Sequence, residues 1–151
     1  MTGKKVVFAF LCLMFTLSIA AMEILESETA FPPYAIFSAS YRGNVDMVAT
    51  ILAAGVDMDT RDACGATALH IAMFQRNAEV VALLLEHGFD PNARNKTGYT
   101  PLHNAVAADN LEAARLLLNY GASKSVRCIN GTTPLDMARN GQRELMLRVL
   151  R

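Results

Sequence analysis

The sequence lacks an excess of charge of either sign. Lysine and arginine together number 14, and aspartate and glutamate together also number 14. Removing Lys4 and Lys5 with the N-terminal leader described below leaves 12 basic residues against the same 14 acidic ones. Proteins that bind nucleic acids carry a basic surface that neutralises phosphates. We therefore expect no nucleic-acid partner.

The sequence also lacks the residue patterns of catalysis and of metal binding. It contains no glycine-rich phosphate loop, no nucleophile elbow and no histidine or cysteine spacing typical of a metal site. Its acidic residues fall in predicted turns or at the starts of predicted helices, where a carboxylate stabilises the helix N-terminus. Carboxylates spread in this way do not converge in a catalytic pocket. The sequence thus predicts a protein that is not an enzyme and needs no cofactor or metal ion.

What the chain does contain is one motif at a constant spacing. The stretch Gly98 to Ala105 (GYTPLHNA) has a close variant starting at Gly65 and another, the same step further on, starting at Gly131. A second glycine series, at positions 55, 88 and 121, keeps the same spacing. A period of about 33 residues with the pattern T-P-L-H-x-A resembles the ankyrin repeat.

This resemblance implies the fold. It predicts an all-α solenoid of about four helix-turn-helix repeats with short projecting turns, over residues 34–61, 62–94, 95–127 and 128–151. In such repeats the partner meets the concave face, made of the turn tips and the first helices.

Local sequence signals place the helices inside the repeats. Thr100 and Pro101 suit the N-cap and the first helical position, and Gly88 and Gly121 suit the left-handed residue after a helix. Repeat 1 is expected to keep helices at about 34–41 and 45–54 without the opening turn. In repeat 4 the spacing of Ala138 and Gly141 predicts an interhelix turn one residue shorter, followed by a final helix at 143–151 that caps the stack.

Residues 1–20 read as a secretory signal peptide. Lys4 and Lys5 precede an apolar block, and Ser18-Ile19-Ala20 offers a cleavage site before Ala21. The alternative is an uncleaved membrane anchor; cleavage predicts no stable membrane insertion. Residues 21–33 are expected to form an N-terminal cap or flexible segment, and the mature chain is expected to be periplasmic or secreted.

Two cysteines remain after cleavage, Cys64 and Cys128. They lie two repeats apart, roughly 20 Å at about 10 Å per packed layer, whereas a disulfide needs Cα atoms within about 7 Å. We therefore expect no internal disulfide, but either two free thiols or one bridge to another molecule. Apart from such a bridge, the chain is expected to be a monomer.

Two further sets of residues recur at the repeat spacing. The resemblance implies that His70 and His103 hydrogen-bond the backbone of the adjoining turn; the alternative is a metal pair. Arg61, Arg94 and Arg127 form a ladder at the feet of the turns. This ladder either grips acidic groups of a partner or pairs with the nearby residues Asp59, Asp62 and Asp90.

Family resemblance also implies the recognition positions, at the turn tips and at the solvent ends of the first helices. Among these positions Tyr41, Phe74 and Tyr99 are the aromatic anchors, and the alternative for them is packing against the neighbouring repeat. The recognition positions that the resemblance implies also include Ala66. With the arginine ladder, the predicted partner-binding residues are Tyr41, Arg42, Phe74, Gln75, Lys96, Thr97, Tyr99, Arg61, Arg94, Arg127, Ile129 and Asn130.

The functional prediction is an exported module that binds one protein partner and blocks or scaffolds it. The chain resembles bacterial exported single-domain ankyrin proteins, which suggests an envelope immunity or inhibitor protein. The alternatives are a periplasmic oxidative-stress helper associated with catalase and a secreted effector that acts on a host protein. The unpaired cysteines motivate the redox alternative.

Overall fold

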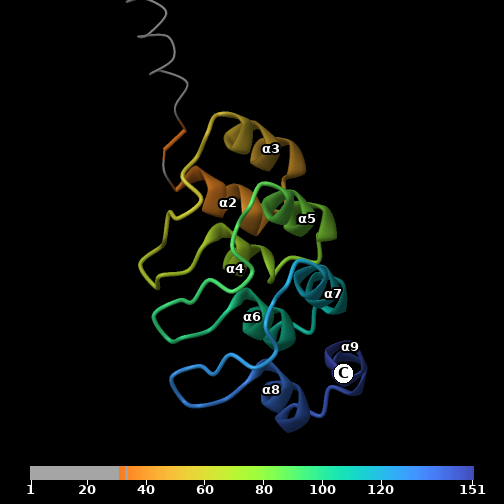
Figure 1. Ribbon diagram of the computed structural model, residues 1–151. Coiled ribbons are helices and arrows are strands. Elements are labelled where there is room, and N and C mark those ends of the chain that lie inside the picture. The colour runs from red at the N-terminus through yellow and green to blue at the C-terminus, as the bar shows by residue number, and fades with distance from the viewer. Residues whose placement is uncertain (1–30, 33) are drawn as a thin grey trace, which may run out of the picture. The chain divides into compact units, whose positions relative to one another are not determined.

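The computed structural model describes residues 31–32 and 34–151, and in this part of the chain every regular element is a helix (Figure 1). The predicted signal peptide lies outside the described residues, as does most of the segment 21–33. Eight helices form four consecutive pairs. Their bounds are α2 Ala35–Arg42, α3 Val45–Ala53, α4 Ala68–Ala72, α5 Ala78–Glu86, α6 Pro101–Ala107, α7 Leu111–Asn119, α8 Pro134–Asn140 and α9 Glu144–Leu150. The predicted all-α repeat solenoid is confirmed.

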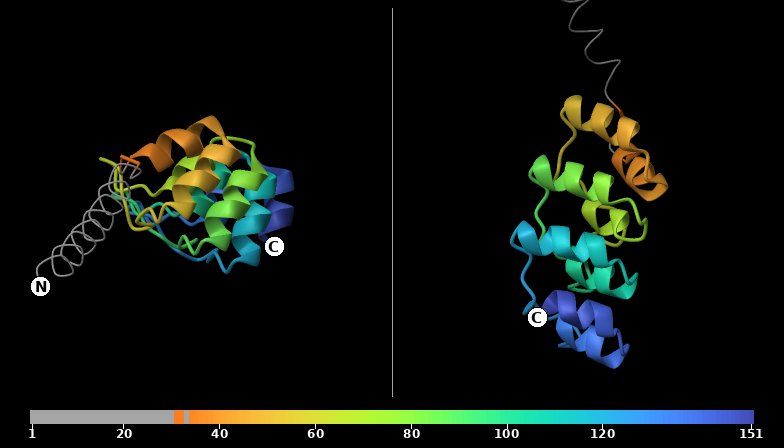
Figure 2. Two further views of the ribbon diagram at one scale, coloured as in Figure 1. Left: turned by 90° about the horizontal axis from the view of Figure 1, so that it is seen from above. Right: turned by 90° about the vertical axis from the view of Figure 1, so that its right-hand side faces the viewer.

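The four pairs stack as two columns. The first helices α2, α4, α6 and α8 contact one another in sequence order, and so do the second helices α3, α5, α7 and α9. The turns before α4, α6 and α8 project from the column of first helices, on the side away from the second helices (Figure 1). Figure 2 shows the pairs one below another in similar orientations. Among the described residues, no helix is both long and apolar enough to span a membrane.

A continuous ribbon of apolar side chains holds the columns together. Ile51, Leu84, Leu117 and Leu150 occupy one equivalent position at the repeat spacing, and each is almost completely buried. Burying one such side chain stabilises the fold by about 1.5–3 kcal/mol. Since each leucine or isoleucine is covered by its neighbours in the stack, no repeat buries its own apolar face alone.

The predicted helix ends are confirmed at several positions. Thr100 is the N-cap of α6 and Pro101 follows at its first position. Gly88 and Gly121, just past α5 and α7, have φ angles of +90° and +85°, the left-handed geometry that favours glycine. The helices of repeat 1 begin and end within about one residue of the prediction, and α9 is one residue shorter at each end than predicted.

The prediction of a shortened turn in repeat 4 is wrong. Asp109 and Gln142, at equivalent positions of adjacent repeats, have φ angles of +53° and +52° and occupy the same place between their helices. The N–H of Asn110 donates to the carbonyl of Ala105, and one repeat later the N–H of Arg143 donates to that of Ala138. The turn therefore keeps its full length. The prediction placed the left-handed residue of this turn at Gly141, but Gln142 occupies that position.

Candidate functional site

The projecting turns form one side of the candidate binding surface, and backbone hydrogen bonds fix each turn. The N–H of Asp62 donates to the carbonyl of Ala66 at 3.0 Å, and the same bond recurs in the next two turns. The Asp62 carboxylate accepts from the N–H groups of Cys64 and Ala66, both at 2.8 Å. Because Ala66 is only 5% exposed, its prediction as a recognition position is wrong.

Successive turns are also joined to one another. The N–H of Lys96 donates to the carbonyl of Cys64, and the N–H of Ile129 donates to that of Thr97, each at 3.0 Å. The ammonium group of Lys96 reaches the Ala63 carbonyl at 2.8 Å. The turn edge is therefore a connected row rather than a set of independent loops.

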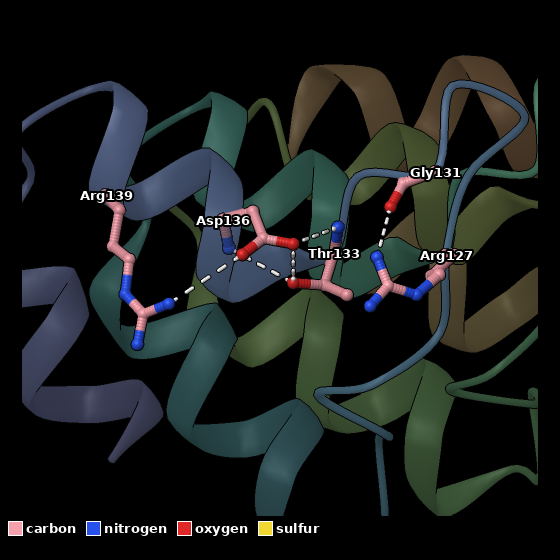
Figure 3. Close-up of polar contacts among 5 residues, drawn as sticks. All are labelled: Arg127, Gly131, Thr133, Asp136 and Arg139. Atoms are coloured by element: carbon pink, nitrogen blue, oxygen red, sulfur yellow. Dashed lines mark hydrogen bonds and ion pairs between the residues drawn. The ribbon is translucent and has the colours of Figure 1, made fainter.

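The arginine ladder holds the feet of these turns. Arg61 donates to the carbonyls of Gly65 (3.1 Å) and Arg94 (3.2 Å), and Arg94 donates to the carbonyl of Arg127 (3.0 Å). Arg127 donates to Gly131 (2.6 Å; Figure 3). The predicted pairing with Asp59, Asp62 and Asp90 is wrong, since the ion pairs within the described part of the chain are Arg139–Asp136 and Arg148–Glu144. A guanidinium group offers five donors, so a backbone carbonyl of the next turn satisfies it in place of a carboxylate.

His70 and His103 link each first helix to the following turn. The N–H of Thr67 donates to Nδ1 of His70 at 3.2 Å, and His103 accepts the equivalent bond at 3.1 Å. A peptide N–H only donates, so Nδ1 is unprotonated and the proton sits on Nε2. Nε2 of His70 then donates to the Tyr99 carbonyl at 3.0 Å, and that of His103 donates to the Thr132 carbonyl at 3.2 Å. The predicted contact of both histidines with the adjoining turn is confirmed.

Burial lowers the pKa of both histidines below its ordinary value of 6.5. The main cause is desolvation, because the charged imidazolium loses its hydration inside the stack. Protonation would also turn the accepting Nδ1 into a donor facing another donor. These histidines therefore remain neutral and serve the fold.

Asp136, drawn in Figure 3, lies in repeat 4 at the position equivalent to His103. Its carboxylate accepts from the hydroxyl of Thr133 at 2.7 Å and from the Thr133 N–H at 3.1 Å. The Thr133 hydroxyl, followed by its N–H, lowers the pKa of Asp136 below the ordinary value. Asp136 thus caps α8 within its own repeat and, unlike the histidines, makes no bond to a following turn.

An asparagine ladder, absent from the sequence-based predictions, fixes the turns between the paired helices. Asn77 Nδ2 donates to the carbonyl of Gly43 at 2.8 Å in the preceding repeat. Asn110 Nδ2 donates in the same way to the carbonyls of Met73 (3.2 Å) and Gln75 (3.0 Å). The spacing of asparagines 44, 77 and 110 was the signal for this ladder. It predicts their role as N-caps but not the carbonyls they reach in the neighbouring repeat.

Apart from the arginine ladder and Tyr99, the predicted recognition residues fall into two groups. The turn-tip group, Lys96, Thr97, Ile129 and Asn130, is exposed, with Ile129 at 71%. The second group lies at the ends of the first helices of repeats 1 and 2.

We call this second group the helix-end patch. Tyr41 is 59% exposed, and Phe74, at the equivalent position of the next repeat, is 54% exposed. Exposed Arg42 and half-buried Gln75 adjoin them. The structure adds exposed Arg76, which the sequence-based predictions missed although it directly follows Gln75. The helix-end patch comprises these five residues.

Tyr99 differs from the other two predicted anchors. It is half-buried, and its ring stacks on His103 with the ring centroids 5.2 Å apart and the planes 8° from parallel. This ring packs within its own repeat and presents less surface to a partner than Tyr41 or Phe74.

The remaining reactive groups do not converge. Cys64 is exposed at a turn tip, Cys128 is buried, and both are free thiols. No cluster of three metal-binding side chains occurs within residues 31–32 and 34–151. A depression of about 430 Å³ on α7 is lined by one helix alone, through Leu111, Glu112, Arg115, Leu116 and Asn119.

Comparison with known proteins agrees with the geometry. The chain matches the family described as "Ankyrin repeats (3 copies)" at residues 12–95, 36–128 and 88–150. No curated protein matches the chain.

Proposed function

Because this chain belongs to the ankyrin-repeat family, whose members are protein-interaction modules, we propose that it holds one protein partner on the turn tips and the helix-end patch. The observation that carries this proposal is the exposure of large apolar side chains in these two groups of residues. Tyr41, Phe74 and Ile129 are all more than half exposed. Aromatic residues dominate the binding energy of protein interfaces, so Tyr41 and Phe74 are the anchors, and Ile129 adds apolar contact area.

The mechanism is steric occupation of the partner by a preformed surface. Backbone bonds between turns and the asparagine bonds between repeats hold both groups of residues in place before binding. Little conformational entropy is then lost when the partner docks. A rigid stack of this kind blocks or scaffolds its partner without chemical change.

We further propose that the module is exported and acts in the cell envelope, where it inhibits one protein as an immunity factor does. The support is the leader pattern of residues 1–20. Mass measurement of the protein recovered from the envelope fraction tests export: a mature chain starting at Ala21 supports it, and a chain that retains residues 1–20 contradicts cleavage.

Affinity capture tests the binding surface. The full chain with a C-terminal tag is expressed in its source cells, and proteins recovered with it are compared with those recovered by Tyr41→Ala and Phe74→Ala variants. One stoichiometric partner lost in both variants supports the proposal. Leu145→Ala is the matched control, since Leu145 is 59% exposed on α9 in the other helix column.

Capture that is unchanged by Tyr41→Ala and Phe74→Ala contradicts this surface. If the partner is a toxin, loss of protection in the same variants identifies an immunity protein. A partner from a host cell instead identifies a secreted effector.

The oxidative-stress alternative has one favourable observation, the free and exposed thiol of Cys64 on a turn tip. It predicts that Cys64→Ser lowers survival in peroxide. The buried Cys128 offers the matched variant, Cys128→Ser. Equal survival of both variants and the unmodified protein contradicts the redox role.

A further inference from the structure

The helix-end patch exists only in the first half of the stack. Tyr41 and Phe74 are replaced at the repeat spacing by Ala107 and Asn140, which occupy the same place at the ends of α6 and α8. The same helix pair forms in all four repeats, so the fold does not require a ring at this position. Two large exposed rings on adjacent repeats therefore point to a role in contact with another molecule.

The charged residues beside the rings also differ between the first two repeats and the last two. Arg42 and Arg76 are exposed, and neither belongs to an ion pair among the described residues. In repeats 3 and 4 the equivalents of Arg76 are Asp109 and Gln142. At these equivalent positions the first two repeats thus combine rings with positive charge, and the last two repeats have neither.

The wider surface extends this positive charge. Seven exposed basic residues lie on the first helices, the interhelix turns and the projecting turns: Arg42, Arg61, Arg76, Arg94, Lys96, Arg127 and Arg139. The acidic residues there are exposed Asp109 and half-buried Asp62 and Asp136. The opposite excess occurs on the second helices and the loops after them. Eight exposed acidic residues lie there, Asp46, Asp57, Asp59, Glu79, Glu86, Asp90, Glu112 and Glu144, against four exposed basic ones, Arg115, Lys124, Arg148 and Arg151. Two of the three acidic groups on the basic side already accept hydrogen bonds from their own turns, Asp62 and Asp136.

The backbone under the patch is fixed by the following repeat. Asn77 holds the carbonyl of Gly43, which directly follows Arg42, and Asn110 holds that of Gln75. The rings and the two guanidinium groups therefore extend from a surface that is ordered before binding. Such a surface favours a partner whose groups match it without rearrangement.

Resting on the function proposed above, we infer that the helix-end patch docks an acidic protein segment in which carboxylates flank an aromatic side chain. The rings of Tyr41 and Phe74 receive the aromatic group, and Arg42 and Arg76 receive the carboxylates in the forked geometry that guanidinium favours. The positive charge along the turns attracts the rest of the segment, and the acidic second helices repel it from the other side.

Synthetic polymers of defined chemistry test this inference with the full chain. Fluorescence anisotropy measures the binding of labelled poly-L-glutamate, a random glutamate–tyrosine copolymer (4:1) and poly-L-lysine over a series of salt concentrations. The copolymer is expected to bind about tenfold more tightly than poly-L-glutamate, and its affinity is expected to fall as salt is raised. Poly-L-lysine is expected not to bind.

Variants localise the effect. Arg42→Gln with Arg76→Gln is expected to weaken copolymer binding about tenfold and to reduce its salt dependence. The matched control is Arg115→Gln with Arg148→Gln, which removes the same charge from exposed positions on α7 and α9 and is expected to change binding less than twofold. Circular dichroism checks that all variants retain their helices.

Three results would overturn the inference: no copolymer binding by the unmodified chain, equal losses in the test and control variants, or binding of poly-L-lysine. An oligothymidylate that binds more tightly than the copolymer would also overturn it and assign the patch to nucleic acid. The proposed function fails separately: if capture of the partner still depends on Tyr41 and Phe74 but not on Arg42 and Arg76, a binding module remains and only the acidic chemistry is wrong.

Discussion

Repeats 2 and 3 satisfy their polar groups, whereas repeats 1 and 4 each leave one buried polar atom without a partner among the described residues. In the two central repeats His70 and His103 bond to the next turn, and asparagine N-caps bond to the preceding repeat. In repeat 1 the hydroxyl of Ser40 is buried without a partner. In repeat 4 the same holds for Nη1 of Arg143, which replaces the asparagine N-cap.

Hydrogen bonds between neighbouring repeats therefore add to the stability that apolar burial supplies, and they do so mainly in the central repeats. The stability of a repeat array is approximately a sum of terms for each repeat and for each interface. The central histidines and asparagines contribute to the interface terms. Repeats 1 and 4 are therefore expected to open before repeats 2 and 3.

The largest expected effect is the loss of a central link. His103→Ala removes a buried ring, its bond to Thr132 and its bond to the capping threonine of α6. The free energy of unfolding is expected to fall by about 3 kcal/mol, from the cavity and the unpaired groups together. Urea unfolding measures this change. His87→Ala, an exposed position at the end of α5, is the control and is expected to change stability by less than about 0.5 kcal/mol.

Acid should weaken the same links in the central repeats. The lowered pKa of His70 and His103 means that the unfolded chain binds more protons than the folded chain as pH falls through 6.5. Their contribution is fully present above pH 6.5 and is lost progressively below it. The urea concentration at the midpoint of unfolding is expected to decrease when the pH is lowered from 7.5 to 5.5. A constant midpoint over this range would contradict the buried, neutral state of both rings.

Replacing Ser40 in repeat 1 should reduce the difference in stability between this repeat and the central repeats. Ser40 occupies the position of Met73 and Val106, which are buried and apolar. Ser40→Ala removes the unpartnered hydroxyl and is expected to raise the free energy of unfolding by about 1 kcal/mol. Ser38→Ala is the control, because the exposed Ser38 hydroxyl already donates to the Ala35 carbonyl. A loss of stability in Ser40→Ala would show that its hydroxyl is satisfied in solution.

A smaller gain is expected from repairing repeat 4. Arg143→Asn restores the residue of the equivalent positions 77 and 110 and offers α9 a side-chain N-cap. The expected gain is at most about 1 kcal/mol. Arg148→Ala, on the exposed face of α9, should change stability by less than about 0.5 kcal/mol. If both variants behave alike, the buried Nη1 of Arg143 does not weaken the repeat.

Short-range patterns predicted most of the fold. The threonine before α6, the proline at its start and the glycines after α5 and α7 act within a few residues of their own helix, so their roles follow from the sequence. The prediction of a shortened turn in repeat 4 was wrong because it assigned the left-handed conformation to Gly141, whereas Gln142 adopts it. Such a conformation is uncommon for a residue other than glycine.

The candidate site was less predictable from the sequence. Tyr41 and Phe74 are exposed as expected, but Tyr99 stacks on His103 and Ala66 is buried. All four residues were predicted to be recognition positions from their place in the repeat alone. Their exposure depends on which side chains of the same and adjacent repeats cover them.

The sequence alone determined the period, the helix pairs and the set of equivalent positions, because the apolar pattern and the capping residues are local. The tertiary structure decided what those positions contact. Arg61 bonds to the carbonyl of Arg94, 33 residues away, and Asn77 bonds to that of Gly43, 34 residues away. A hydrogen bond requires atoms within about 3 Å, and only the offset between stacked repeats brings one carbonyl rather than its neighbour to that distance.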